Sequence, residues 1–351
     1  MEKKNWLGKT FFLHADSMKE FDFSTAQFAQ FLIKFSYVGT AYSGLAYTDE
    51  ATPTIEREIF RALLKTRMIQ DRQSCKFSRC GRTDSGVHAA GNYLCLSLRT
   101  GIDHIRVLNK VLPRDIRFLA IREVSADFNA RFKCTGRCYK YFQPVWQGLD
   151  VALMEVAAQQ LVGSHDFRNF CKMDVAATTN YVRCIYGVSF RLDEPKSVLE
   201  IEIIGNGFLW HQIRCIVAIL LLIGEQLEEA SLISKLLDLE QTPRKPLYPL
   251  ADPSGLVLYD CNFEGINFTL EEAHGPLTAH RETLASHLRL SAVMQAINGL
   301  PTVAAGSIPN WFERRSHKPI ANRGTGPSLD EKVASHKRKL QALAPSSEEL
   351  E

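Results

Sequence analysis

A segment with chemical potential is CGRTDSGVHAAG, residues 80–91, where Asp84 stands between two hydroxyl residues and near two glycines. Glycines permit the tight or left-handed turns that present a carboxylate outward. A carboxylate presented in this way can act as a nucleophile or stabilise a developing cation. Arg82, two residues earlier, can contact phosphate or support a neighbouring anion. An Asx-turn between two strands is the simpler structural interpretation of a generic D-S-G loop.

Alternation and apolar periodicity predict the elements that must position this loop. Strands are expected at 31–38, 92–98, 116–124, 138–145, 182–191, 197–204 and 256–261, and helices at 53–64 (with Thr52 as cap), 107–112, 151–162 and 208–223. The order strand, helix and paired strands occurs twice and predicts two α+β halves with partly antiparallel sheets. The expected divisions are a lead-in at 1–30, a half at 31–147 that holds the Asp84 loop, a second half at 148–267 and an extension at 268–351.

The composition is that of an ordinary globular protein, with 45% hydrophobic residues, 23% charged residues and a net charge of +3 over 351 residues. Residues 72–140 carry 14 Lys or Arg against 5 Asp or Glu, which favours an anionic partner. The nine cysteines include no C-x-x-C pair, which favours a reduced cytoplasmic or nuclear compartment and does not indicate a zinc site. The most apolar run, 216–223, is far shorter than the roughly 20 residues that span a bilayer, so no membrane partner is expected.

Five strings in the same order resemble the motifs of the TruA-type tRNA pseudouridine synthases, over roughly residues 31–262. They are GRTDSGVHA (81–89), RCYKY (137–141), GSHDF (163–167), GFLWHQIRCIV (207–217) and ADPSGLVL (251–258). One departure is Asp252, where the family usually has alanine before proline. RNFCKMDV (168–175), FSRCGRTD (77–84), LWHQIRC (209–215) and HKPIANRG (317–324) are similar to the eukaryotic branch that modifies positions 38 and 39 of the tRNA anticodon arm.

The resemblance implies an α+β fold with two similar RRM/ferredoxin-like halves, which share a continuous, mainly antiparallel sheet and enclose a catalytic cleft. It implies that the Asp84 carboxylate attacks the target nucleotide while uridine is isomerised to pseudouridine. Whether it adds to the ribose or acts by way of a glycal stays open. Burial against a base would raise the pKa of this carboxyl, and a guanidinium partner, Arg214, would oppose that rise. The partners implied are tRNA and a second copy of the chain, and the redox-neutral reaction implies no metal or organic cofactor.

The resemblance also assigns roles around the target base. Tyr139 is expected to stack on the base and help remove its proton, and Leu256 is expected to close the pocket. Further substrate contacts are expected from Arg79, Arg82, His88, His165 and Asp166. His211, beside the implied arginine, is interpreted as a structural residue or an RNA contact and not as a proton shuttle. Without the resemblance, Tyr139 would be a strand core tyrosine. Arg214 would be a helix-surface arginine, but its apolar neighbours Ile213, Cys215 and Ile216 favour a buried, paired role.

Two other classes of protein remain as alternatives. A non-catalytic RRM-like RNA-binding module would share the α+β order, but no RNP aromatic signature is present and the module gives no reason for an aspartate–arginine pair. A retropepsin-like protease also has an aspartate in D-S-G. Such a protease requires apolar residues before the aspartate, where this chain has Arg82 and Thr83, and a second carboxylate from a dimer mate.

The C-terminal region carries a basic segment, with 8 basic and 2 acidic residues between Arg314 and Lys339. Ser328 is expected to cap a helix whose first turn holds two acidic residues. Leu329, Val333 and Leu340 recur near helical spacing and predict a thin apolar edge that docks on the body. The basic far end of the helix is then expected to contact the tRNA backbone. A solvated charge run is the simpler interpretation of such a segment.

Overall fold

The computed structural model describes residues 21–193, 198–266, 268 and 317–343. Much of the expected lead-in at 1–30 and of the expected extension at 268–351 therefore falls outside the described residues. The connection between the strands expected at 182–191 and 197–204 also lies largely outside them.

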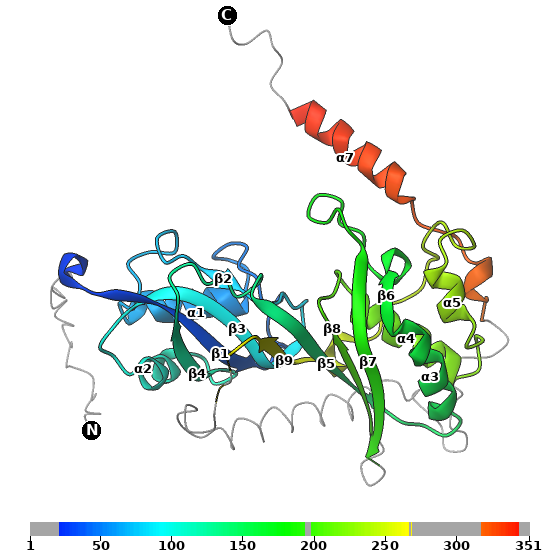
Figure 1. Ribbon diagram of the computed structural model, residues 1–351, viewed down its shortest axis with the longest axis horizontal. Helices are drawn as coiled ribbons and strands as arrows, with labels where there is room; N and C mark the ends of the chain where they lie inside the picture. The colour runs from blue at the N-terminus through cyan, green and yellow to red at the C-terminus, as the bar shows by residue number, and fades with distance from the viewer. Residues whose placement is uncertain (1–20, 194–197, 267, 269–316, 344–351) are drawn as a thin grey trace, which may run out of the picture.

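The described strands form one nine-stranded sheet in the order β4-β1-β3-β9-β5-β8-β7-β6, with β2 paired to β3 (Figure 1). Their bounds are β1 Phe28–Tyr37, β2 Ser78–Arg79, β3 His88–Arg99, β4 Ile116–Val124, β5 Cys134–Pro144, β6 Gly163–Asp166, β7 Val182–Asp193, β8 Val198–Gly205 and β9 Leu256–Phe263. All pairs are antiparallel except β3 with β9. The expected mixed α+β fold with one large sheet is confirmed, and the likeness of its halves to an RRM unit stays a prediction.

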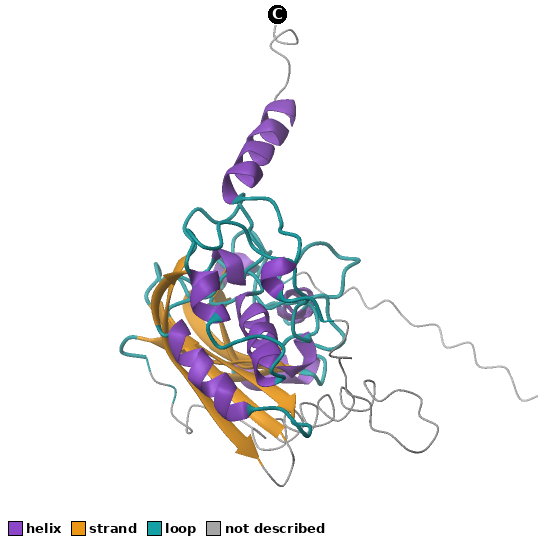
Figure 2. Cartoon of the chain, turned by 90° about the vertical axis from the view of Figure 1, so that its right-hand side faces the viewer, coloured by secondary structure: helices purple, strands orange, loops and turns teal. Residues whose placement is uncertain are grey.

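The helices of the described residues lie mostly to one side of the curved sheet (Figure 2). They are α1 Ile55–Lys65, α2 His104–Val111, α3 Val151–Ala158, α4 Gln212–Gly224, α5 Leu232–Leu237 and α7 Leu329–Leu343. Short 3-10 helices cover η1 Phe23–Thr25, η2 Gln159–Leu161, η3 Arg168–Phe170, η5 Pro253–Gly255 and η6 Ile320–Asn322. None of the helices in the described part has the length and apolar character needed to cross a bilayer.

Helix α1 begins two residues after the expected start. The side chain of Thr54, not Thr52, caps it and accepts a hydrogen bond from the Arg57 amide at 3.2 Å. The Thr52 hydroxyl and amide bind the Asp49 carboxylate instead, at 3.0 and 2.7 Å. The predicted cap was wrong because a side-chain turn ahead of the helix competes for the same hydroxyl.

Helix α4 forms the core of the C-terminal part, and eleven of its thirteen residues are buried. It packs so closely on α3 that a Cβ at Gly224 would lie only 2.5 Å from the Met154 sulfur. Residues buried on all sides of a helix belong to a protein interior. The apolar run at 216–223 is therefore a core helix, as the sequence indicated.

Strand β9 joins the two ends of the sheet, because it pairs with β3 on one edge and with β5 on the other. Strand β5 also pairs with β8, so its hydrogen bonds are made to strands from the second half of the chain. The boundary expected at residue 147 assigned β5 to the first half, and this boundary stays a prediction.

The segment before α7 is fixed to the body. Ile320 is fully buried, its amide donates to Glu228 at 2.6 Å, and Thr325 forms a β-bridge with Pro246. The cap of α7 is confirmed, since Ser328 and Glu331 exchange hydrogen bonds at 2.9 and 3.1 Å.

The predicted docking of α7 was wrong beyond its first two turns. Leu329 packs against the core and Val333 is half-buried, but Leu340 is 56% exposed and the helix projects away from the body (Figure 1). The apolar edge is too thin to hold the remaining turns against solvent.

Candidate active site

The loop between β2 and β3 presents Asp84 on a tight turn. The Val87 amide donates to the Asp84 carbonyl at 3.2 Å, and Gly86 has a φ of +79°. That conformation favours glycine, because a Cβ would meet the following carbonyl. The Asp84 side chain is 27% exposed, so its carboxylate is accessible from outside although the turn that carries it is fixed.

The loop that follows β1 supports this turn. The Leu45 amide donates to the Thr83 carbonyl at 3.1 Å, and the Gly86 amide donates to the Tyr42 carbonyl at 3.3 Å. A Cβ at Gly39 would lie 2.0 Å from the Val87 carbonyl oxygen, so only glycine permits this close approach of the two loops. The position of Asp84 is therefore set by backbone contacts.

Three nitrogen donors from the residues at the start of α4 face the Asp84 carboxylate. Trp210 Nε1 donates to one carboxylate oxygen at 3.1 Å. His211 Nε2 and Arg214 Nη1 lie 3.5 and 4.0 Å from the other oxygen. In the described part of the chain, the hydrogen-bond and ion-pair partners of Asp84 are nitrogen donors, whereas aspartic proteases pair two carboxylates.

Arg214 lies beside Asp84, as the resemblance implied. Its side chain is 14% exposed, and its Nε donates to the Ala251 carbonyl at 2.7 Å. The Ala251 amide in turn donates to the Arg214 carbonyl at 3.2 Å, which fixes α4 against the segment before β9. The guanidinium is thus oriented by the backbone and approaches Asp84 at the outer limit of an ion pair.

His211 takes a left-handed backbone conformation, with a φ of 65°, at the N-terminus of α4. Burial lowers the pKa of its imidazole, and the Asp84 carboxylate opposes that shift only in part. The imidazole is therefore mainly neutral near pH 7 and can donate a hydrogen bond to Asp84 without forming a salt bridge.

Tyr139 and Leu256 lie on the central strands β5 and β9. Tyr139 is 7% exposed, and its ring packs edge-on against Phe208 with centroids 5.3 Å apart. Burial raises the pKa of the Tyr139 hydroxyl, which keeps it protonated at neutral pH. Leu256, 5% exposed, lies opposite Tyr141 in the β5–β9 register. Both residues are positioned by the core of the sheet.

The departure at Asp252 has a local explanation. Its carboxylate accepts the Ser254 amide at 2.8 Å and so caps the 3-10 helix η5. Its carbonyl accepts the Tyr141 hydroxyl at 3.0 Å. An aspartate therefore serves at this position as a turn residue.

Two of the other predicted substrate contacts, Arg79 and His88, already have partners within the protein. Arg79 binds Glu56, which is 1% exposed, through contacts of 2.5 and 2.9 Å. His88 is fully buried, and its Nδ1 accepts the Gly39 amide at 3.2 Å. Arg82 differs, because it is exposed on the Asp84 loop itself.

His165 and Asp166 lie on β6, the strand at the end of the sheet farthest from β4. His165 Nε2 contacts the Val162 carbonyl at 3.0 Å, and Asp166 binds Arg168 through two contacts of 3.1 and 2.5 Å. The described contacts give both side chains structural partners. Substrate contacts by these residues stay a prediction.

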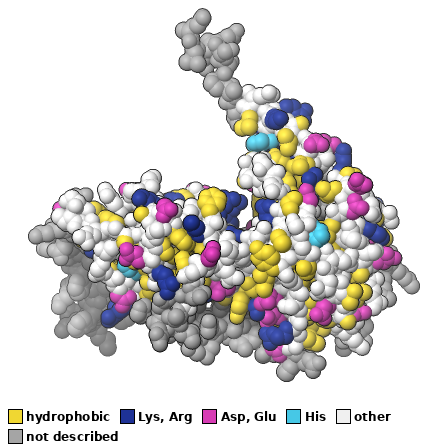
Figure 3. All heavy atoms as spheres, in the orientation of Figure 1, with side chains coloured by type: hydrophobic (Ala, Val, Ile, Leu, Met, Phe, Trp, Pro, Cys, Tyr) yellow, Lys and Arg dark blue, Asp and Glu magenta, His cyan; other side chains and the backbone are white. Residues whose placement is uncertain are grey.

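Trp210 was not among the residues predicted for the site. Its indole is 42% exposed although it contacts Asp84, and Lys172 Nζ lies 4.0 Å from the ring centroid. An exposed aromatic ring beside a lysine is suited to stacking on a nucleobase. The available signal was a tryptophan in the otherwise apolar run before α4. Figure 3 shows Lys and Arg side chains along the edge of the hollow between the two parts of the molecule.

Comparison with known proteins gives consistent matches. The profile of a family described as tRNA pseudouridine synthase matches residues 157–264. The tRNA pseudouridine(38/39) synthase of Bos taurus is 37% identical, over 88% of this chain and 72% of that protein. The enzyme of the same name from Saccharomyces cerevisiae is 35% identical, over 88% of this chain and 74% of that protein.

A more distant relative supports the same family. The tRNA pseudouridine synthase A of Methanosarcina mazei is 32% identical, over 67% of this chain and 86% of that protein. Relatives at these identities, covered over most of their length, together with the carboxylate geometry around Asp84, lead to one assignment. The chain belongs to the tRNA pseudouridine synthase family, whose members are isomerases that act on tRNA.

Proposed function

We propose that this chain converts uridines 38 and 39 of the tRNA anticodon arm to pseudouridine, with Asp84 as the nucleophile. The observation that carries the proposal is the Asp84 carboxylate, fixed on a glycine-bounded turn with Arg214, His211 and Trp210 within 4.0 Å. The positions come from the names of the relatives from cattle and yeast.

The reaction breaks the bond from ribose C1′ to N1 of uracil and forms a bond from C1′ to C5. In one route the Asp84 carboxylate adds to C1′ and displaces the uracil anion, which turns and attacks C1′ through C5. In the other route the Asp84 carboxylate takes the proton from C2′, the uracil anion leaves C1′ and a glycal forms. The proton returns to C2′ as C5 of the turned base bonds to C1′. Either route ends with loss of the C5 proton and return of a proton to N1, so the reaction is balanced without a cofactor.

The surrounding residues have separate roles in this proposal. Arg214 and Trp210 orient the Asp84 carboxylate, because both present nitrogen donors to its oxygens. Tyr139 supports the base with its ring, and its neutral hydroxyl is assigned to relaying the C5 proton, which it takes up as it releases its own proton to water. Leu256 closes the apolar side of the pocket. Arg82, exposed on the same loop, contacts the tRNA backbone.

The remaining expectations concern assembly and location. A homodimer is proposed, in which one tRNA contacts both copies. A cytoplasmic or nuclear location is proposed from the cysteine content, and all nine cysteines are free thiols in the structure.

The test uses unmodified tRNA and purified full-length chain. Pseudouridine is mapped by carbodiimide modification and primer extension after single-turnover reaction. Wild type should modify positions 38 and 39, and Asp84→Asn should be at least about a thousandfold slower, because the nucleophile is lost. Tyr139→Phe tests the hydroxyl in the same assay.

The matched control is Ser85→Ala, a change to the neighbouring exposed side chain, which should retain activity within a few-fold. Asp84→Asn and Ser85→Ala should both bind tRNA with the affinity of wild type. Asp84→Asn activity within tenfold of wild type would remove Asp84 from the catalytic role. Modification confined to other positions would refute the site assignment and leave the family unchanged.

A further inference from the structure

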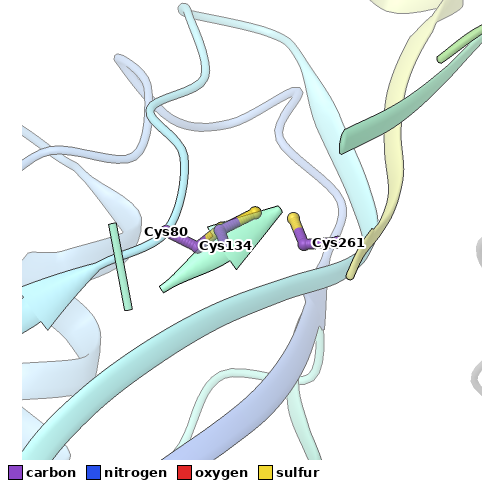
Figure 4. Close-up of side chains that lie close together, drawn as sticks. All are labelled: Cys80, Cys134 and Cys261. Carbon is purple, nitrogen blue, oxygen red and sulfur yellow. The ribbon is translucent and has the colours of Figure 1, made fainter. Parts of the chain in front are cut away.

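Three cysteines that are far apart in the sequence meet beside the Asp84 loop. Cys80 directly follows β2, Cys134 is the first residue of β5 and Cys261 lies in β9. Their Sγ atoms all lie within 4.8 Å of one another. Figure 4 shows the three sulfur atoms gathered in one place.

The surroundings of the cluster are dry and positively charged. Cys80 and Cys261 are 3% and 4% exposed, and Cys134 is half-buried. Arg137 Nη2 donates to the Cys80 carbonyl at 3.0 Å. Arg137 Nη1 also donates to the Asn206 carbonyl at 2.8 Å, so two backbone carbonyls fix the guanidinium.

Arg137 supplies a fixed positive charge beside the cluster. Metal ligands must be deprotonated, so a guanidinium beside the three thiols offsets part of the negative charge that their thiolates bring when an ion binds.

We propose that Cys80, Cys134 and Cys261 bind a zinc ion as a three-thiolate structural site. Thiolates select soft ions such as Zn²⁺ or Cu⁺. Zinc is favoured by charge, because one divalent ion together with the Arg137 guanidinium neutralises three thiolates, whereas a monovalent ion leaves one negative charge buried. Zinc–sulfur bonds of about 2.3 Å place tetrahedral sulfurs about 3.8 Å apart, within reach of small side-chain rotations from the observed spacing.

The fourth ligand would come from the half-buried side of the cluster. The Gly136 carbonyl lies 3.2 Å from the Cys134 sulfur, and a water at Cys134 is the other candidate. The Cys261 sulfur, 3.9 Å from the Gly91 carbonyl, faces the buried side. Most structural zinc sites have four protein ligands, whereas three protein ligands plus one exchangeable ligand is the coordination of catalytic sites; a backbone carbonyl such as that of Gly136 would close this site.

The site would tie the Asp84 loop to the centre of the sheet. Cys80 is followed directly by Gly81, whose carbonyl accepts the Asn92 side chain at 3.0 Å. An ion shared by Cys80, Cys134 and Cys261 would cross-link that loop, β5 and β9, the strands that carry Tyr139 and Leu256. It would be a structural ion and would take no part in the isomerisation.

The test measures metal on the full-length chain. Protein expressed with zinc and dialysed against zinc-free buffer is analysed by inductively coupled plasma mass spectrometry, and about one zinc per chain is expected. Cys134→Ser should weaken zinc binding by more than the about 10–100-fold that loss of an outer-sphere partner causes. Cys184→Ser, at a half-buried cysteine outside the cluster, is the matched control and should retain the zinc.

X-ray absorption on wild type decides the ligands even where Cys134→Ser does not fold. Three sulfurs at about 2.3 Å support the site. A first shell without sulfur, zinc content near zero in wild type, or equal zinc in Cys134→Ser and wild type overturns the proposal. Thiol titration that finds a disulfide within the cluster also overturns it.

Discussion

The Asp84 loop and helix α7 are both short polar segments, but the protein holds them in opposite ways. Backbone hydrogen bonds with Tyr42 and Leu45 fix the loop on one side, and the donors at the start of α4 face its carboxylate. Helix α7 is fixed only near its start and extends into solvent. Chemistry at one carbon atom requires a carboxylate placed within fractions of an ångström. Attraction to a phosphate backbone acts over about a Debye length and tolerates a mobile support.

The largest expected effect in this comparison concerns Arg214. Arg214→Ala should lower the single-turnover rate about 100–1,000-fold, the range seen when one preorganised donor to developing charge is removed. The free energy of unfolding should fall by about 1–3 kcal/mol, because the Ala251 carbonyl loses its donor. This is below the about 3–5 kcal/mol of a fully buried pair, since Asp84 is 27% exposed. Rapid-quench kinetics measure the rate, and urea unfolding measures the free energy of unfolding.

Arg61→Ala is the matched control, because Arg61 is 49% exposed in its ion pair with Glu50. It should change stability by less than about 1 kcal/mol and leave the rate unchanged. An Arg214→Ala protein with the unfolding curve of wild type would show that Arg214 is unpaired in solution.

Replacement of Trp210 tests whether its indole positions the Asp84 carboxylate. Trp210→Phe removes the 3.1 Å hydrogen bond to Asp84 and retains an aromatic ring below Lys172. A hydrogen bond to a charged group contributes about 1.5–3 kcal/mol, so the single-turnover rate should fall at least about tenfold at saturating tRNA. Trp146→Phe, at a tryptophan packed against the core, is the control for loss of an indole. A Trp210→Phe rate within twofold of wild type would assign Trp210 to stacking alone.

The end of α7 should affect binding and not the chemical step. Replacing Lys337, Arg338 and Lys339 with Gln removes three exposed charges, which should weaken tRNA binding about tenfold and reduce the salt slope by about 2. Filter binding across a salt series measures both quantities. Lys332→Gln is the comparison, because Lys332 Nζ already donates to the Met173 carbonyl at 3.3 Å. An unchanged slope for the triple variant would make the helix a solvated end.

The smallest effect concerns pH. The pKa of His211 is lowered in the folded state, so the unfolded chain binds more protons as pH falls below about 6.5. Stability from this group is therefore complete above that pH and is lost as pH falls towards the folded pKa. Thermal unfolding from pH 7.5 to 5 should show a shallower loss in His211→Asn than in wild type. Burial also lowers the pKa of His104. His104→Asn should therefore also make the loss of stability with falling pH shallower, which gives an independent comparison.

Local patterns predicted much of the fold. The strand at 116–124 and the paired strands β7 and β8 were recovered closely, because each has a continuous apolar or alternating run. The parallel contact of β9 with β3 was not predicted, since nothing local in either strand encodes a partner across the whole fold. Arg79 was assigned to substrate, but a buried acid, Glu56, came from a helix far from it in sequence.

The residues of the site also differ in how far the sequence predicts them. Asp84 and Arg214 could be predicted to meet because the resemblance assigned them as partners, and their positions agree. Trp210 lies in the same string, but its hydrogen bond to Asp84 is a tertiary contact between distant segments, which no local pattern encodes. The Cys80, Cys134 and Cys261 cluster left no local spacing signal, because its members come from three separate segments.

The place of β9 in the sheet has a consequence for biosynthesis. Strand β3 pairs with β9 only at His88 and Ala89, beside the Asp84 loop. At about 5–20 residues per second, β9 leaves the ribosome roughly ten to thirty seconds after Asp84. During that interval the edge of β3 is open to pairing with other chains, as any exposed strand edge is. The nascent chain therefore carries Asp84 for many seconds before β9 can complete the sheet beside it.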